Sequence, residues 1–285
     1  MTDAALRNIS DTARWVAVYR AIESERPDAW FHDPLAARLA GERGREITKT
    51  MDFGHKNSWS FVARTVLFDR FVTSGVKQGT DMVVNLAAGL DTRPYRMDLP
   101  ADLPWIEVDL PELLHDKAEA LAGETPRCRL ERVALDLSDR AARRAFFDAL
   151  GTRARHVLVM SEGLVVYLDQ DEVTKLAEDL LRPASFKTWA LDMVSPRLMQ
   201  MMQASNDQKN LSQAGAPLKF APVEGPAFFS RFGWAPVEVS SLLHTAAALK
   251  RLSFRMRLFA FFPDPAGKVP NAPWGGVCVF NRSAP

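Results

Sequence analysis

The chain has 285 residues, of which 47% are hydrophobic and 25% are charged, the composition of an ordinary globular protein with a large core. Its 36 basic and 35 acidic residues leave a formal charge of +1, which excludes the basic surface of a nucleic-acid-binding protein. The two cysteines, Cys128 and Cys278, exclude a disulfide scaffold and a cysteine-built zinc site.

The polar segment 1–19 lacks the apolar core of a signal peptide. No apolar run elsewhere approaches the roughly 20 residues that span a bilayer. We therefore expect a cytoplasmic protein without a membrane partner.

The first 75 residues show helical patterns only. Pro34 starts a predicted helix that stops at Gly41 and Gly44, and apolar residues at helical spacing predict an amphipathic helix over 59–75. We expect residues 1–75 to form an N-terminal helical cap.

From residue 81 short apolar runs alternate with helical patterns, which predicts parallel βαβ units in an α/β sheet. Such continuous apolar strands suit a sheet that is covered on both faces. Residues 76–194 are the predicted cofactor-binding core, with strands at 82–86, 105–108, 130–135 and 156–160, a fifth around 189–191, and helices from Pro111 and over 169–181.

Between residues 195 and 235 the periodicity fails. We interpret this segment as a lid or substrate insertion over the carboxyl edge of the sheet, with a disordered loop as the alternative. Residues 236–285 then complete the sheet of a single domain, 1–285, with a strand at 237–239, a helix near 242–252 and a last strand at 276–280.

Four consecutive predicted strands end on a glycine or a carboxylate: Gly89, Asp109, Asp136 and Glu162. The carboxyl ends of parallel strands meet at one edge of an open α/β sheet, where ligands bind. Gly89 permits close approach of a ligand, and Asp109, twenty residues later, can accept hydrogen bonds from both ribose hydroxyls. Asp136 can hold an adenine amino group. The alternatives are helix caps for the two aspartates and an arginine partner for Glu162.

The turn after the first strand discriminates between nucleoside cofactors. Residues 87–92 carry one of the three glycines that a dinucleotide-binding turn requires. Asp91 would repel a pyrophosphate at the following helix N-terminus. S-adenosylmethionine offers the same adenosine group with a sulfonium and no phosphate, so the turn favours this methyl donor over NAD(P).

Three segments, 87–93 (AAGLDTR), 107–111 (EVDLP) and 161–168 (SEGLVVYL), together resemble the leucine carboxyl methyltransferase-like family. The similarity is greatest to its bacterial branch, which includes polyketide-tailoring O-methyltransferases, and extends to 15–19, 23–29, 33–36 and 232–234. The resemblance implies a Rossmann-like class I methyltransferase fold, a seven-stranded sheet whose last strand is antiparallel.

The resemblance also implies site residues. Arg64, which by itself is an ordinary helix-surface arginine, would pair with the cofactor carboxylate, and Glu162 would bind its amino group. Ala87, where many relatives have glycine, predicts weaker cofactor binding. The predicted cofactor-binding residues are Arg64, Ala87 and Gly89 beside the methionine part, Asp109 and Leu110 at the ribose, Asp136 and Leu137 at the adenine, and Glu162.

We expect a small-molecule O-methyltransferase that acts on a carboxylate or hydroxyl of a secondary metabolite and releases S-adenosylhomocysteine. A carboxylate is ionised at neutral pH and needs no base, whereas an alcohol would gain roughly 10²–10⁴-fold from one. The candidates for such a base are Tyr167, His244, His55 and Asp192. The histidines form no ligand pattern, so we expect no metal.

Three alternatives remain: a protein carboxyl methyltransferase, an NAD(P)-dependent oxidoreductase, and a binding module without turnover. The segment 193–202 with Phe228, Phe229 and Trp234 predicts either an apolar acceptor pocket or core packing. The sequence leaves the oligomeric state open.

Overall fold

The computed structural model describes residue 6, residues 10–265 and residues 271–283. All seven predicted strands form one sheet in the order β3-β2-β1-β4-β5-β7-β6. Strands β1 to β5 are parallel, and β7 is antiparallel to both of its neighbours, as predicted. The strands are β1 Met82–Leu86, β2 Pro104–Asp109, β3 Arg129–Ala134, β4 Val157–Ser161, β5 Phe186–Val194, β6 Trp234–Ser241 and β7 Gly275–Arg282.

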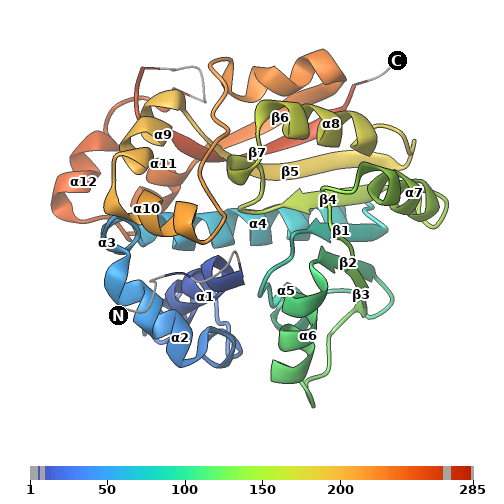
Figure 1. The fold of residues 1–285 in the computed structure, drawn as a ribbon, viewed down its shortest axis with the longest axis horizontal. Helices are drawn as coiled ribbons and strands as arrows, with labels where there is room; N and C mark the ends of the chain where they lie inside the picture. The colour runs from blue at the N-terminus through green and yellow to red at the C-terminus, as the bar shows by residue number, and fades with distance from the viewer. Residues whose placement is uncertain (1–5, 7–9, 266–270, 284–285) are drawn as a thin grey trace.

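The sheet crosses the middle of the molecule with helices above and below it (Figure 1). The helices are α1 Ser10–Ser24, α2 Ala36–Thr50, α3 Asp52–Lys56, α4 Trp59–Lys77, α5 Arg93–Arg96, α6 Pro111–Ala120, α7 Arg140–Gly151, α8 Gln170–Leu180, α9 Pro196–Gln203, α10 Asn206–Gln213, α11 Leu242–Ala248 and α12 Phe254–Phe259, with 3-10 helices η1 Val165–Tyr167 and η2 Gly225–Phe232. Pro111 begins α6 as predicted, and Asp169 forms a capping box with Glu172 at the start of α8.

Alternate residues of the buried strands enter two separate cores, because successive strand side chains point to opposite faces. On one face, Val84 and Val159 pack with α7 and α8. On the other face, Val83 and Leu158 pack with Leu67, Phe68, Phe71 and Val72 of α4. Helix α4, which the sequence analysis grouped with the N-terminal cap, is therefore also a covering helix of the sheet.

The predicted stop at Gly41 and Gly44 is correct in part: helical geometry breaks at Gly41, but a second helical stretch follows it and runs through Gly44 to Thr50. Gly41 bends the helix, with φ of +60°, and helical geometry resumes after it. At Gly44 a Cβ atom would lie 2.9 Å from the Arg14 carbonyl oxygen of α1. The absent side chain thus serves the close packing of α1 on α2.

The segment 195–235 is not a disordered loop. Helices α9 and α10 and the stretch up to Leu218 pack against Trp15, Tyr19 and Ile47 of the N-terminal helices. Phe220 and η2 pack instead on the face of the sheet that α7 and α8 also cover. The insertion therefore joins the N-terminal helices to the sheet.

The carboxyl-terminal region departs from the prediction in one place. The helix predicted near 242–252 ends at Ala248, Lys250 adopts φ of +58°, and an unpredicted helix, α12, follows. Pro236 lies at a register shift in the edge strand β6, where a missing N–H is tolerated. Among the described residues, no helix has the length and apolar character to traverse a bilayer.

Candidate active site

A cavity of about 580 Å³ opens at the carboxyl ends of β1, β2 and β4. The predicted meeting of strand ends at one edge of the sheet is therefore present. Every residue that the sequence analysis proposed for cofactor binding lines this cavity: Arg64, Ala87, Gly89, Asp109, Leu110, Asp136, Leu137 and Glu162.

The turn after β1 and the end of β2 are joined through the carboxylate of Asp109. The Gly89 N–H donates to one carboxylate oxygen over 2.7 Å, and the Leu110 N–H donates to the other over 2.8 Å. Burial raises the pKa of Asp109 above its ordinary value, although these two donors act in the opposite direction. Each oxygen keeps a second acceptor position for a ligand hydroxyl. Asp109 is not the cap of α6, where no side chain caps the helix.

Gly89 allows helix α1 to approach this turn. It adopts φ of +50°, and a Cβ atom there would lie 3.3 Å from the Ala13 side chain of α1. Ala87, two residues earlier, adopts φ of +52° although it carries a Cβ, a conformation that costs about 1–2 kcal/mol in a residue other than glycine.

Arg64 lies between two carboxylates. It bonds to Glu162 and to Asp192, each over 3.0 Å, and its side chain is largely buried rather than on the helix surface. Burial lowers the pKa of Arg64, but the charges of Asp192 and Glu162 outweigh burial and raise it. Asp192 also accepts the Gly163 N–H over 2.6 Å, which fixes the turn that follows Glu162.

Arg93 is a site residue that the sequence analysis missed. It lies 2.9 Å from Glu162 and also pairs with Asp69 and Asp91. Burial by itself raises the pKa of Asp91, but the charges of Arg93, Lys117 and Arg96 outweigh burial and lower the pKa to about 2. The signal for Arg93 in the sequence was a pair of opposite charges, Asp91 and Arg93, in a turn that is otherwise uncharged. Glu162 thus has two arginine partners, the alternative that the sequence left open.

At the far end of the cavity, Asp136 follows β3 and remains exposed. The Ser138 N–H donates to its carboxylate over 2.8 Å, a bond that lowers the pKa of Asp136. Asp136 does not cap α7, because Asp139 accepts the N–H groups of Ala141 and Ala142 there. Its carboxylate therefore keeps acceptor positions beside the apolar wall of Leu135 and Leu137.

The opposite wall comes from helices that the sequence could not position. Trp15 and Val16 of α1 and Phe61 of α4 line it, with Trp15 and Phe61 ring centroids 5.2 Å apart. The insertion contributes Gly215 and the exposed Lys219. Tyr167 is also in the wall, and burial raises the pKa of its phenol to about 12.

Two of the base candidates lie elsewhere. His55 is exposed on α3, and His244 donates from Nε2 to the Phe262 carbonyl over 2.9 Å; neither lines the cavity. They were chosen by residue type, which carries no information on position. Asp192 is engaged by Arg64 and Gly163. Within the described ranges, no group of three or more His, Cys, Asp or Glu side chains could hold a metal ion.

The acceptor pocket predicted around Phe228, Phe229 and Trp234 is also wrong. All three side chains are fully enclosed in the core, where the Phe229 ring lies 5.1 Å from that of Trp189. Met193 and Met199 are buried as well, and no residue of 193–202 lines the cavity. Core packing, the other interpretation, is correct for these five residues, whereas Met201 is exposed.

The model of the leucine carboxyl methyltransferase family matches residues 13–181, the part that builds most of this cavity. The chain belongs to the leucine carboxyl methyltransferase family. A relative from Parafrankia sp., named for S-adenosyl-L-methionine-dependent methyltransferase activity, is 31% identical over 268 residues, 89% of this chain and 86% of its own. One of the same name from Rhodococcus jostii is 37% identical over 188 residues, 61% of this chain and 63% of its own.

Solved structures share the fold of this leucine carboxyl methyltransferase family member. A methyltransferase structure from Thermobifida fusca superimposes with a TM-score of 0.62 at 14% identity, covering 99% of this chain and 97% of its own. A DUF574 family protein from Streptomyces avermitilis reaches 0.58 at 16% identity, covering 96% and 97%. The protein is thus an S-adenosylmethionine-dependent methyltransferase, which sets aside the oxidoreductase and the binding module without turnover.

Proposed function

We propose that the eight predicted residues hold S-adenosylmethionine in this family member. The geometry fits the cofactor: the Gly89 turn has no side chain that would extend into the cavity it lines, and Asp109 presents acceptor positions beside it. Asp109 and Leu110 would bind the ribose, and Asp136 with Leu137 the adenine. Arg64 and Glu162 already compensate each other's charge, so they match the carboxylate and the ammonium of a zwitterionic amino acid.

We infer further that the methyl acceptor is a carboxylate of a small, largely apolar molecule. The observation that carries this proposal is the kind of titratable groups in the walls: no histidine lines the described cavity, and the Tyr167 phenol has a pKa of about 12. A carboxylate is ionised at neutral pH and needs no proton removed. A hydroxyl acceptor would be served best by a base whose pKa lies near neutrality, such as a histidine, and no histidine lines the described cavity.

When bound, the cofactor supplies a methyl group activated by its sulfonium. The residues of the chain have to align the acceptor and exclude water, effects worth about 7–11 kcal/mol in well-oriented reactions. Trp15 and Phe61 provide an apolar wall for the body of the acceptor, and Lys219 brings a positive charge to the same side. The carboxylate of the acceptor would lie toward Lys219 during binding.

The test compares matched compounds. The purified protein is incubated with S-adenosylmethionine and with aromatic and aliphatic carboxylic acids or their corresponding alcohols and phenols, and methylated products are identified by mass spectrometry. We expect methyl esters, which mild alkali hydrolyses. Methyl ethers from the alcohols would contradict the proposal. A methylated peptide carboxyl terminus with no small-acid product would favour the protein carboxyl methyltransferase instead.

A variant sharpens this test. Lys219→Met should raise KM for the acid about tenfold and leave the Kd for S-adenosylmethionine unchanged. Lys187→Met is the matched control, because Lys187 is also exposed but lies outside the cavity. Equal KM values for the two variants would remove Lys219 from the acceptor site.

A further inference from the structure

The helix α12 and the turn after it carry an unusual concentration of exposed apolar side chains. Within nine residues, Phe254, Leu258, Phe259, Phe261 and Phe262 are each between 51% and 83% exposed, and no residue of α12 is buried. Surface apolar residues are ordinarily scattered singly, whereas a contiguous patch marks an interaction site. We call these five residues the aromatic tip.

The aromatic tip is held in shape from both ends. Met256 and Ala260 pack against the cluster that contains Val62 and Ala246. At the start of α12 the Ser253 hydroxyl accepts the Met256 N–H, and beyond its end the His244 bond to the Phe262 carbonyl fixes the turn. The exposure of the tip is therefore a property of an anchored segment.

Helical geometry places charge on both flanks of the tip. A helix turns by about 100° per residue. With Met256 facing the core, Phe254 and Leu258 point to the opposite side, and Arg255 and Arg257 lie on the two flanks. Neither arginine forms an ion pair among the described residues, in contrast to Arg64, Arg93 and Arg251. The outward face of α12 is thus apolar with a basic rim.

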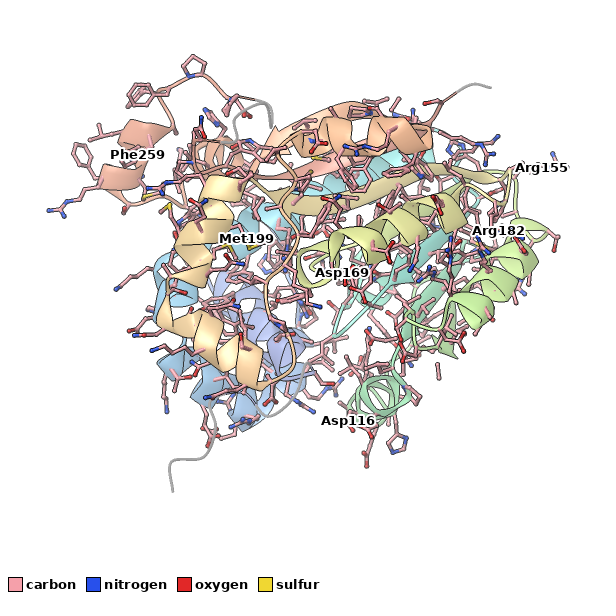
Figure 2. All side chains as sticks on the ribbon, turned by 45° about the horizontal axis from the view of Figure 1, so that its top comes forward. Asp116, Arg155, Asp169, Arg182, Met199 and Phe259 are labelled. Atoms are coloured by element: carbon pink, nitrogen blue, oxygen red, sulfur yellow. The ribbon has the colours of Figure 1, made fainter. Side chains whose placement is uncertain are left out.

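The segment also projects from the body of the protein. Figure 2 shows α12 at the edge of the molecule, with Phe259 at its outer side. A flat partner would touch only the tip of such a projection, whereas lipid can surround it. A second copy docked face to face would bring Arg255 and Arg257 toward their own equivalents, so like charges would meet.

We propose that the aromatic tip docks the protein on the surface of a bilayer that contains anionic lipid. The phenylalanines would enter the boundary of the acyl chains, and the two arginines would remain at the anionic headgroups, the arrangement of interfacial amphipathic segments. This peripheral contact requires no spanning helix. It replaces the expectation that a membrane is no partner of this chain.

The experiment measures co-sedimentation of the full chain with vesicles of phosphatidylcholine alone and of phosphatidylcholine and phosphatidylserine in equal parts. We expect binding to the mixed vesicles that weakens as salt increases. Phe259→Ser with Phe261→Ser should lower the partition coefficient at least tenfold, and Arg255→Gln with Arg257→Gln about fivefold per arginine. Val223→Ser, which changes an exposed apolar residue outside the tip, should have no effect.

Calorimetric titration with S-adenosylmethionine verifies that each variant is folded and separates this proposal from the assignment of the active site. No binding of the wild-type chain to mixed vesicles overturns the proposal. A loss of vesicle binding in Val223→Ser that equals the loss in the double serine variant also overturns it. Sedimentation velocity tests whether a second copy of the chain binds the aromatic tip instead. If the wild type forms a dimer that the double serine variant does not form, and the wild type does not bind vesicles, the tip is a dimer interface.

Discussion

The carboxylate of Asp109 and the N–H of Gly89 form a 2.7 Å hydrogen bond between the end of β2 and the turn after β1. Asp109→Asn keeps the shape of the side chain but replaces one acceptor by a donor, which opposes the N–H groups of Gly89 or Leu110 and a ribose hydroxyl. Hydrogen bonds to charged groups contribute about 1.5–3 kcal/mol. We therefore expect the Kd for S-adenosylmethionine to rise at least tenfold in calorimetric titration. Glu112→Gln, an exposed change in the next helix, is the control.

Acid should weaken the fold through Asp91. Its pKa in the folded chain, about 2, lies below the ordinary value of 3.8, so the stabilisation is present above pH 3.8 and is lost as pH falls toward 2. The difference corresponds to about 2 kcal/mol. Asp91→Asn should lower the free energy of unfolding by about that amount at neutral pH. Urea denaturation should show that the difference in unfolding free energy between the wild type and Asp91→Asn becomes smaller below about pH 4.

The comparison variant for this test is Asp171→Asn, which removes an exposed partner of Lys175 and should cost less than about 0.5 kcal/mol. A gap between wild type and Asp91→Asn that stays constant through the acidic range would show that the charge of Asp91 contributes nothing.

Tyr167 should be dispensable as a base. Because its pKa is about 12, the phenol is protonated at neutral pH, and Tyr167→Phe should retain kcat within about threefold and keep the same pH profile. A general base would instead lose roughly 10²–10⁴-fold. Steady-state kinetics from about pH 6 to pH 9 distinguishes the two, and loss of one limb of the profile would restore Tyr167 as a catalytic residue.

Phe229 should matter for stability alone. Its ring is fully buried and lies 4.9 Å from the ring of Phe280. Phe229→Ala should lower the free energy of unfolding by about 3–5 kcal/mol. At a temperature where the variant is folded, its Kd for S-adenosylmethionine and its KM for the acceptor should equal those of the wild type. A selective rise in KM would return Phe229 to the acceptor site.

Ala87→Gly should stabilise the protein. Glycine relieves the left-handed conformation at φ of +52°, and after its larger chain entropy is subtracted we expect a gain of about 0.5–1 kcal/mol, seen as a higher Tm. Ala145→Gly on the exposed side of α7 should do the opposite by about 1 kcal/mol. Tighter cofactor binding in Ala87→Gly would agree with the sequence expectation for this turn.

Sequence patterns located the strand-end half of the cavity because parallel strands impose a common edge. Once β1, β2, β3 and β4 alternate with helices, Gly89, Asp109, Asp136 and Glu162 must approach one another. Their individual partners come from distant parts of the chain, which local patterns do not bring together. The pairing of Glu162 with both Arg64 and Arg93 therefore became known only with the fold.

The other half of the cavity was beyond the reach of local patterns. Trp15 and Lys219 lie some 200 positions apart in the chain and meet only because α1 packs against the insertion. Helix α12 escaped notice for a different reason: its apolar residues face outward, so they form no core-directed stripe of the kind that predicts a helix.

Helix α4 presents Phe68 to the core of the sheet and, one turn earlier, Arg64 to Glu162 and Asp192. The orientation of the arginine is consequently set by hydrophobic packing along the rest of the helix. An insertion of one residue between the two would turn Arg64 by about 100° away from its carboxylates while the packed part stayed in register. We therefore expect that relatives differ in the length of α4 between Arg64 and Phe68 only by whole helical turns. Other insertions and deletions should lie outside this part of the helix.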